Sequence, residues 1–368
     1  MSVEKIDIEF FLRLSKECPV LDVRSPAEFN HAHIPGTYSI PLFTDEQRAV
    51  VGTAYVKESR KIAVDHGLNY FSERMKIIPG EVSSIVSEWQ KKNTNISSFP
   101  SGSGSSILIH CWRGGMRSEA VAWLMNLYGY KIYILKGGYK AFRRWALSQF
   151  EKKYSLKVLG GFTGSGKTDI LKELKQKGKA VIDLEALANH KGSAFGALGE
   201  EPQPGHEMFE NLIALELFKI RTDNNTDELQ TKDNDPEIWI EDESVHIGKV
   251  GIPKAFWQEM RNSPLFFIDI PFEERVNYIV KTYGIFDNKL LAECVLKIQK
   301  RLGGLDTKNA IHFLSENNLT ETFSILLKYY DKTYEKSLNK RENIHSLLNK
   351  VTCKKVENSN AEKLMILK

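Results

Sequence analysis

The run from Leu156 to Thr168 constrains the fold of this chain more than any other segment. Its apolar first half is suited to a buried strand, its second half reads G-x-x-x-x-G-K-[ST], and a helical pattern from Asp169 to Leu174 follows directly. A glycine-rich loop in this setting is a P-loop, whose backbone amides cradle phosphate at a helix N-terminus. The run therefore predicts an α/β domain with a phosphate or diphosphate site at the end of this strand.

Each part of the P-loop has an expected role. The glycines let backbone amides approach the ligand, Lys167 reaches the terminal phosphates, and the Thr168 hydroxyl can ligate Mg²⁺. The residues predicted to bind the phosphate groups are Gly161, Gly164, Ser165, Gly166, Lys167 and Thr168.

Two acidic segments end apolar strands further along the chain. Asp183 and Glu185 belong to the first, and Glu241, Asp242 and Glu243 to the second. Acids at the carboxyl ends of parallel strands face the ligand crevice of an open sheet. They could hold Mg²⁺ through water or act as bases, and N-capping of the next helix is an equal alternative for the first pair.

A second candidate site is the run His110-Cys-Trp-Arg-Gly-Gly-Met-Arg-Ser118. A strand-like stretch precedes it and a helical stretch follows, so loop amides and the positive end of the helix dipole converge near Cys111. This setting stabilises a thiolate, which makes Cys111 the predicted nucleophile. The loop residues expected to hold an anion beside it are Arg113, Gly114, Gly115, Arg117 and Ser118.

Two other interpretations of this loop stay open from the loop alone. A lone cysteine is often a buried core thiol without chemistry. The pattern His-Cys-x-x-Gly-x-x-Arg-Ser is also the phosphate loop of protein tyrosine phosphatases, so the loop does not decide between sulfur and phosphate chemistry.

Segments outside the loop favour sulfur chemistry. Residues 19–29, 31–36 and 136–139 resemble the opening and closing signatures of rhodanese-type sulfurtransferases, although Asp22, Arg24 and His33 could equally be structural. A phosphatase would present an aspartate general acid on a loop, and no such segment stands out. The resemblance implies that Cys111 carries a persulfide or a selenium analogue.

Composition is consistent with two domains. The 368 residues exceed the length at which one core usually stops growing, and 42% of them are hydrophobic. The sequence has no apolar run long enough for a membrane span and no secretory signal pattern. Its four cysteines lack metal-ligand spacing, so we expect a cytoplasmic protein.

These observations together predict an α/β protein with three regions. We expect a rhodanese-like domain with a parallel sheet over residues 1–150 and a P-loop α/β domain over 151–285. A helical C-terminal region over 286–368 is expected to pack on the P-loop domain.

One family joins these two domains in this order. The chain resembles the bacterial tRNA 2-selenouridine synthases over nearly its whole length. A Ser/Gly-rich stretch at 101–106 departs from the family pattern, and we expect it to be a loop away from the chemistry. Besides the two anion loops, the resemblance rests on residues 48–55, 183–196, 209–211, 241–248, 301–304 and 329–331.

The resemblance implies a transferase acting on 2-thiouridine at the wobble position of tRNA. A geranyl group from geranyl diphosphate first alkylates the thiocarbonyl sulfur, and selenium from selenophosphate then displaces the alkyl thiol to leave 2-selenouridine. In this interpretation the P-loop binds the diphosphate and Cys111 carries selenium as a selanylsulfide. His190 and Ser193 are candidates for closing over the substrate.

The resemblance also implies the partners. Selenophosphate and geranyl diphosphate are expected as co-substrates, with no tightly bound cofactor, Mg²⁺ as a candidate ion and no metal ligand assigned. The expected partners are the lysine, glutamate and glutamine tRNAs and an enzyme that supplies selenophosphate, with no membrane. The net charge is only +4, so we expect tRNA to bind a local basic cluster, with Arg143 and Arg144 as the predicted contacts.

Two functions of other classes remain open. One is a phosphate-hydrolysing enzyme, either a cysteine phosphatase fused to an ATPase or an RNA-repair kinase, and nucleotide turnover by the purified protein would favour it. The other is a non-catalytic sulfur carrier or tRNA-binding adaptor. A persulfidated Cys111 without modified product would favour the second.

Overall fold

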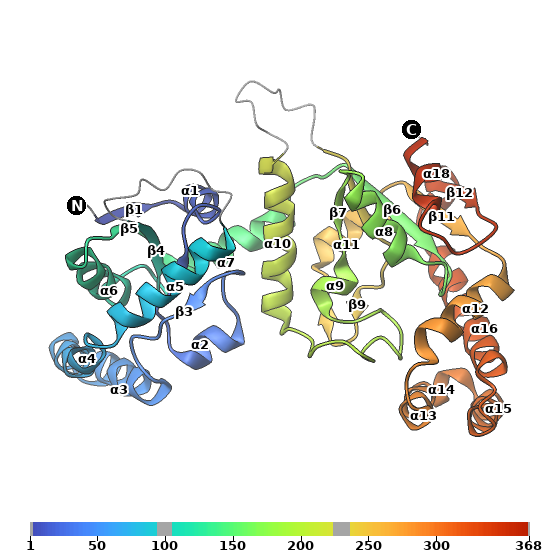
Figure 1. Cartoon of the computed structure of the whole chain (residues 1–368), viewed down its shortest axis with the longest axis horizontal. Helices are drawn as coiled ribbons and strands as arrows, with labels where there is room; N and C mark the ends of the chain where they lie inside the picture. Colours follow the sequence, from blue (N-terminus) through green and yellow to red (C-terminus); the bar gives the residue numbers. More distant parts are fainter. Residues whose placement is uncertain (1–2, 94–104, 224–235, 367–368) are drawn as a thin grey trace. The chain divides into compact units, whose positions relative to one another are not determined.

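The computed structural model describes residues 3–93, 105–223 and 236–366. The chain divides into two compact units, Met1–Ser148 and Gln149–Lys368, each with its own five-stranded sheet (Figure 1). Most of the Ser/Gly-rich stretch that the sequence predicts to be a loop lies outside the described residues.

The first unit is built on a parallel sheet with the strand order β1-β5-β4-β2-β3. Its central strand is fully buried from Ile107 to Ile109, because helices cover the sheet. The strands are β1 (Val3–Ile6), β2 (Val20–Asp22), β3 (Tyr38–Ser39), β4 (Ser106–His110) and β5 (Lys131–Leu135).

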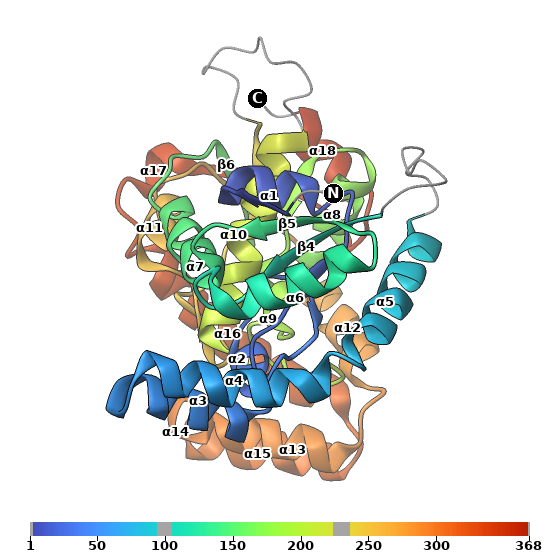
Figure 2. The same cartoon turned by 90° about the vertical axis from the view of Figure 1, so that its left-hand side faces the viewer.

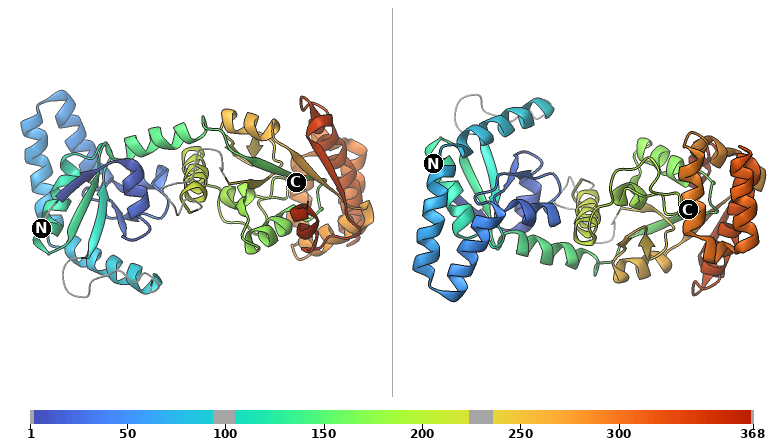
Figure 3. Two further views of the ribbon diagram at one scale, coloured as in Figure 1. Left: turned by 90° about the horizontal axis from the view of Figure 1, so that it is seen from above. Right: turned by 90° about the horizontal axis from the view of Figure 1, so that it is seen from below.

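Helices connect these strands and cover the sheet. α6 lies against β4 and β5 (Figure 2), and α3 and α4 form an antiparallel hairpin whose helices run side by side (Figure 3). Side chains of Thr44 and Ser59 cap the two hairpin helices, which fixes where each helix begins. The helices are α1 (Ile8–Leu14), α2 (Pro26–His31), α3 (Asp45–Lys57), α4 (Arg60–Arg74), α5 (Ile78–Lys92), α6 (Met116–Leu127) and α7 (Gly138–Gln149).

A buried ion pair between Asp22 and Arg24 braces the end of β2. The guanidinium donates to the carboxylate through Nε at 2.9 Å and Nη2 at 2.6 Å, and both side chains are almost fully buried. Nη2 also donates to the carbonyl of Ala32, and the guanidinium carbon lies 3.9 Å from the ring centroid of Tyr139. The pair therefore ties three segments of the unit together, which is a structural role.

We expect Arg24→Leu to lower the free energy of unfolding by about 3–5 kcal/mol, because it leaves the Asp22 carboxylate buried without its partner. Urea unfolding of the full chain, followed by near-UV circular dichroism, measures this change. The double variant Asp22→Leu/Arg24→Leu is the control and should be more stable than the single variant, since it removes both charges. A single variant as stable as the double one would contradict this account.

The second unit has a parallel sheet with the strand order β12-β11-β6-β8-β7 and a separate antiparallel pair of β9 and β10. β6 feeds the P-loop, and β7 and β8 lead into the two acidic segments. Because the three strands are parallel, the P-loop and both acidic segments meet at one edge of the sheet. The strands are β6 (Leu156–Gly161), β7 (Ala180–Ile182), β8 (Ile238–Glu241), β9 (His246–Ile247), β10 (Val250–Gly251), β11 (Leu265–Asp269) and β12 (Leu348–Thr352).

The helices after β11 form a core of their own beside this edge. Phe195, from the loop after α9, packs into that core against Tyr283 and Phe323. The helices of the unit are α8 (Lys167–Gln176), α9 (Leu184–Ala188), α10 (His206–Asp223), α11 (Lys254–Arg261), α12 (Phe272–Tyr283), α13 (Asn288–Lys297), α14 (Gln299–Leu302), α15 (Gly304–Ser315), α16 (Leu319–Leu338), α17 (Ile344–Leu347) and α18 (Asn360–Ile366).

The sequence pattern predicts a helical C-terminal region, but the structure shows that this region also contains a strand, β12. β12 joins the sheet edge in parallel with β11, in a register that runs from Leu348 opposite Leu265 to Thr352 opposite Asp269. Val351 is the one buried residue of this strand, so the strand carries too little apolar alternation to be recognised from sequence. No helix within the described ranges is both long and apolar enough to cross a membrane.

Candidate active site

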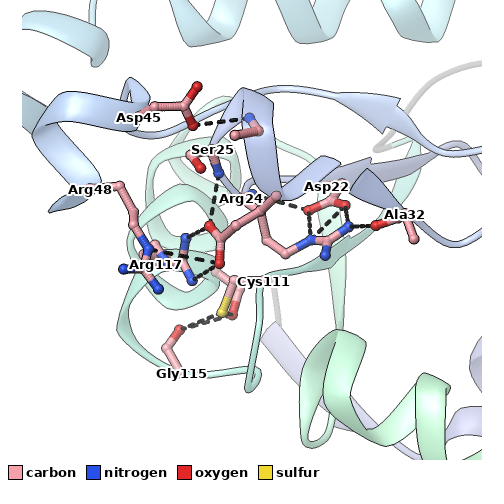
Figure 4. A network of polar contacts seen from close by, with 12 residues as sticks. Asp22, Arg24, Ser25, Ala32, Asp45, Arg48, Cys111, Gly115 and Arg117 are labelled. Carbon is pink, nitrogen blue, oxygen red and sulfur yellow. Dashed lines mark hydrogen bonds and ion pairs between the residues drawn. The ribbon is translucent and has the colours of Figure 1, made fainter. Parts of the chain in front are cut away.

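In the first unit Cys111 lies in the turn between β4 and α6. Its thiol is buried, with 3% of the residue exposed, and it points toward the carbonyl of Gly115 at 3.9 Å (Figure 4). Sγ also lies 3.3 Å from the hydroxyl of Ser118. The Ser118 hydroxyl donates to the carbonyl of Gly115 at 2.8 Å. That hydroxyl can also turn toward sulfur, so Ser118 is placed to stabilise either protonation state of the thiol.

One glycine of the cysteine loop and one of the loop before α7 permit these two loops to pack closely. Gly114 and Gly138 both have positive φ, and a Cβ on Gly138 would collide with the carbonyl oxygen of Cys111. The amide of Tyr139 donates to this carbonyl at 2.8 Å. The loop before α7 therefore packs directly against the backbone of Cys111. Gly138 is a site residue that the sequence analysis did not assign.

The two arginines of the cysteine loop have different surroundings. Arg117 donates to the carboxylate of Glu28, at 2.6 Å from Nη1 and 3.4 Å from Nη2, and Arg48 approaches the same carboxylate (Figure 4). Burial alone would raise the pKa of Glu28, but the hydrogen bonds and charge of Arg117 hold it below its ordinary value. Glu28 thus neutralises much of the charge of Arg117, whereas Arg113 is exposed at the loop surface.

The P-loop of the second unit has the geometry that its pattern predicts. It joins β6 to α8, and Gly164 and Gly166 have positive φ. Lys167 Nζ donates to the carbonyl of Gly161 at 2.9 Å, and the hydroxyl of Thr168 donates to Glu185 at 3.2 Å. The ammonium of Lys167 therefore lies over the backbone of the loop.

The remaining P-loop residues are close-packed. Ser165 is 1% exposed, and its hydroxyl has no hydrogen-bond partner among the described residues. A Cβ on Gly164 would lie 2.9 Å from the carbonyl oxygen of Arg275, so the loop rests directly on α12. An unsatisfied hydroxyl in such a loop is available to a ligand.

Three glutamates lie beside the P-loop at the sheet edge. The amide of Glu185 donates to Glu241 at 2.8 Å, and a Cβ on Gly192 would lie 2.9 Å from Glu185 and 3.1 Å from Glu243. Burial raises the pKa of all three carboxyls, and the charge of Glu185 raises the pKa of Glu241 and of Glu243 further. The charge of Lys167 opposes the rise in pKa at Glu185 and Glu243.

The structure gives the other predicted acids different surroundings. Asp183 caps α9 by accepting from the amide of Ala186 at 2.8 Å, which is the capping alternative weighed from the sequence. Asp242 accepts hydrogen bonds from Tyr334 and Arg341 instead of facing the P-loop lysine. Within the described ranges no three or more His, Cys, Asp or Glu side chains are grouped to hold a metal ion.

His190 and Ser193 both lie on the loop after α9, at residues 189–205. His190 is 9% exposed and burial lowers its pKa, so it is packed in the neutral form. The hydroxyl of Ser193 accepts from the amide of Phe195 at 3.2 Å. The sequence analysis assigned both residues to the site and gave Glu185 as an Mg²⁺ ligand, a base or a capping residue. In the structure the Glu185 carboxylate contacts Thr168 directly.

Comparison with known proteins bears on both units. Residues 154–363 match the model of the tRNA 2-selenouridine synthase AAA domain, and residues 9–144 match that of the rhodanese-like domain. The chain belongs to the tRNA 2-selenouridine synthase family. The loop of Cys111 lies within the rhodanese-like match, and the P-loop lies within the AAA-domain match.

Individual members of the tRNA 2-selenouridine synthase family match over most of the chain. A protein of that name from Sulfurovum sp. strain NBC37-1 is 33% identical over 86% of this chain and 88% of its own length. The one from Shewanella denitrificans is 31% identical over 88% of this chain and 89% of its own. The one from Nitrosomonas europaea is 33% identical over 73% of this chain, a match that spans 64% of that protein.

Proposed function

We propose that this protein converts 2-thiouridine at the wobble position of tRNA into 2-selenouridine in two steps. In the first step the thiocarbonyl sulfur attacks C1 of geranyl diphosphate, the C–O bond breaks and diphosphate departs. In the second step water takes the phosphoryl group of selenophosphate as the P–Se bond breaks, and phosphate departs. The selenium, at the oxidation level of selenide, bonds to C2 of the base while the C2–S bond breaks and geranyl thiol departs. Alkylation helps because a thiol leaves far more readily than sulfide.

The observation that carries this proposal is the presence of two anion-binding loops, one in each domain of the family. The P-loop residues from Gly161 to Thr168 would hold the diphosphate, and their amides and Lys167 would stabilise the charge that develops as it departs. The buried thiol of Cys111 would take part in the transfer of selenium. The loop amides and Arg113 would bind the anionic selenium donor beside it.

A divalent cation fits the P-loop site by its donor set. The Thr168 hydroxyl and the carboxylate of Glu185 are 3.2 Å apart, and both offer the oxygen ligands that Mg²⁺ prefers. These two residues and Glu243 would hold the ion against the diphosphate, where it would offset negative charge. The expected tRNA partners remain those for lysine, glutamate and glutamine.

The proposal is tested by nucleoside mass analysis of tRNA from cells with and without this gene. Cells that carry the gene should contain 2-selenouridine, and cells that lack it should retain 2-thiouridine. The purified protein with geranyl diphosphate alone should form S-geranyl-2-thiouridine. Turnover of ATP without either modified nucleoside would instead support a kinase or ATPase.

We expect tRNA binding to depend on the basic face of α7. Arg144 is exposed and Arg143 is half-buried on this helix. Each phosphate contact should contribute roughly 0.7–0.9 to the slope of log K against log salt concentration, so Arg143→Glu/Arg144→Glu should reduce that slope by about 1–2. Fluorescence anisotropy with labelled tRNA at several salt concentrations measures both affinity and slope.

A matched charge reversal controls for this experiment. Lys354→Glu/Lys355→Glu changes two exposed lysines near the C-terminus by the same total charge. If that pair alters the slope and the arginine pair does not, the tRNA lies along the C-terminal segment and the assignment to α7 is wrong.

A further inference from the structure

One face of helix α16 contacts three separate loops at the carboxyl edge of the second sheet. Tyr330, Asp331 and Tyr334 lie within about one turn of each other on this helix. The first two belong to the segment 329–331 that the sequence analysis singled out, yet neither the alkylation nor the selenium step uses them. Their contacts are polar and largely buried, which requires an explanation beyond core packing.

Asp331 reaches the P-loop through an arginine. Its carboxylate accepts from Arg275 at 2.9 Å and 2.8 Å, and Arg275 Nη1 also donates to the carbonyl of Thr163 within the P-loop at 3.1 Å. Arg275 is 4% exposed, and its Nε donates to Ile270. This guanidinium is therefore engaged as a brace for the P-loop backbone and does not face the phosphate site.

Tyr334 connects the start of the P-loop to the end of β8. Its hydroxyl donates to Asp242 at 2.7 Å, and the amide of Gly161 donates to the same hydroxyl oxygen at 3.4 Å. Arg341 donates to the other oxygen of Asp242 at 2.8 Å from a fully buried side chain. The hydroxyl thus joins the backbone of one loop to the carboxylate of another.

Tyr330 contacts the third loop, residues 189–205. The amide of Ala194, next to Ser193, donates to the hydroxyl of Tyr330 at 3.1 Å. The neighbouring side chain of Phe195 is buried in the helical core. This loop carries His190 and Ser193, so α16 contacts both the P-loop and the loop that is predicted to close over the substrate.

We propose that Tyr330, Asp331 and Tyr334 are positioning residues that couple the P-loop to residues 189–205, so that diphosphate in the P-loop tightens the loop that holds Ser193. A buried polar group is costly to leave without a hydrogen-bond partner. All three loops therefore keep their hydrogen bonds to α16 only when their positions are adjusted together. A ligand that fixes one loop then favours the matching arrangement of the others. The inference deepens the proposed function and rests on it for the identity of the diphosphate ligand.

The test measures hydrogen exchange of the amides from Ser193 to Phe195 in the full chain, with and without inorganic pyrophosphate. In the wild-type protein, pyrophosphate should slow exchange at these amides. In Tyr330→Phe and Asp331→Asn this ligand-dependent slowing should vanish at saturating pyrophosphate, and pyrophosphate affinity should fall roughly tenfold.

Tyr329→Phe is the matched control, since it removes the same atom from the adjacent residue outside these contacts, and it should behave as wild type. If Tyr330 only stabilised its surroundings, Tyr330→Phe would speed exchange equally with and without pyrophosphate, and the slowing by ligand would persist. That result would overturn the coupling. A wild-type protein that shows the coupling but makes no geranylated tRNA would support this inference and overturn the proposed function instead.

Discussion

Cys111→Ser should abolish selenation and leave geranylation largely intact. A hydroxyl is far less nucleophilic than a thiolate and does not carry selenium, whereas the P-loop proposed to bind diphosphate belongs to the other unit. Reactions with geranyl diphosphate and selenophosphate should therefore accumulate S-geranyl-2-thiouridine. Mass analysis of digested tRNA detects this nucleoside directly.

The control for this variant is Cys18→Ser. Cys18 is likewise a buried, free thiol of the first unit, but it lies before β2 and outside the anion loop. It should retain both activities. If Cys111→Ser still formed 2-selenouridine at the wild-type rate, the role of Cys111 in the selenium step would be wrong.

Lys167→Ala should block the first step and leave 2-thiouridine unmodified. Lys167 is the only side chain of the P-loop that carries positive charge, and its ammonium lies over the loop backbone. Its loss should weaken diphosphate binding and remove a donor to the departing group, which lowers the geranylation rate by about 10²-fold or more. Single-turnover assays with saturating geranyl diphosphate separate the rate effect from the binding effect.

Supplying geranylated tRNA should restore selenation in Lys167→Ala. Lys172→Ala, which changes an exposed lysine on the same helix, is the matched control and should retain both steps. Failure of the rescue in a folded Lys167→Ala protein would mean that the P-loop serves both steps. The two variants together assign one step of the reaction to each loop.

The two anion loops could be predicted because their geometry is local. A strand, a glycine-rich turn and a helix are contiguous in the sequence, and the glycines that take positive φ, such as Gly114, Gly164 and Gly166, mark where the backbone must turn tightly. The fold class follows from the same alternation of strands and helices, and the α/β architecture of both domains is confirmed. The family was likewise recognised from these motifs.

The surroundings of the loops depend on residues that are distant in sequence. Glu28 pairs with Arg117, and Gly138 packs against the carbonyl of Cys111. Neither contact is implied by the spacing of these residues in the sequence. The same holds for Glu185 beside Thr168. The acidic pattern after β7 did not decide which of Asp183 and Glu185 caps the next helix. The structure shows that Asp183 caps it and that Glu185 contacts Thr168.

The sequence by itself determined the two phosphate-type loops, the order of the domains and the family, because each is written in contiguous residues whose backbone conformations and spacing are set locally. Only the tertiary structure decided which charges remain available to a ligand. It also placed β12 at the sheet edge and brought α16 against the P-loop. These features arise from packing between segments far apart in the chain, where burial and pairing, and not local propensity, select the partners.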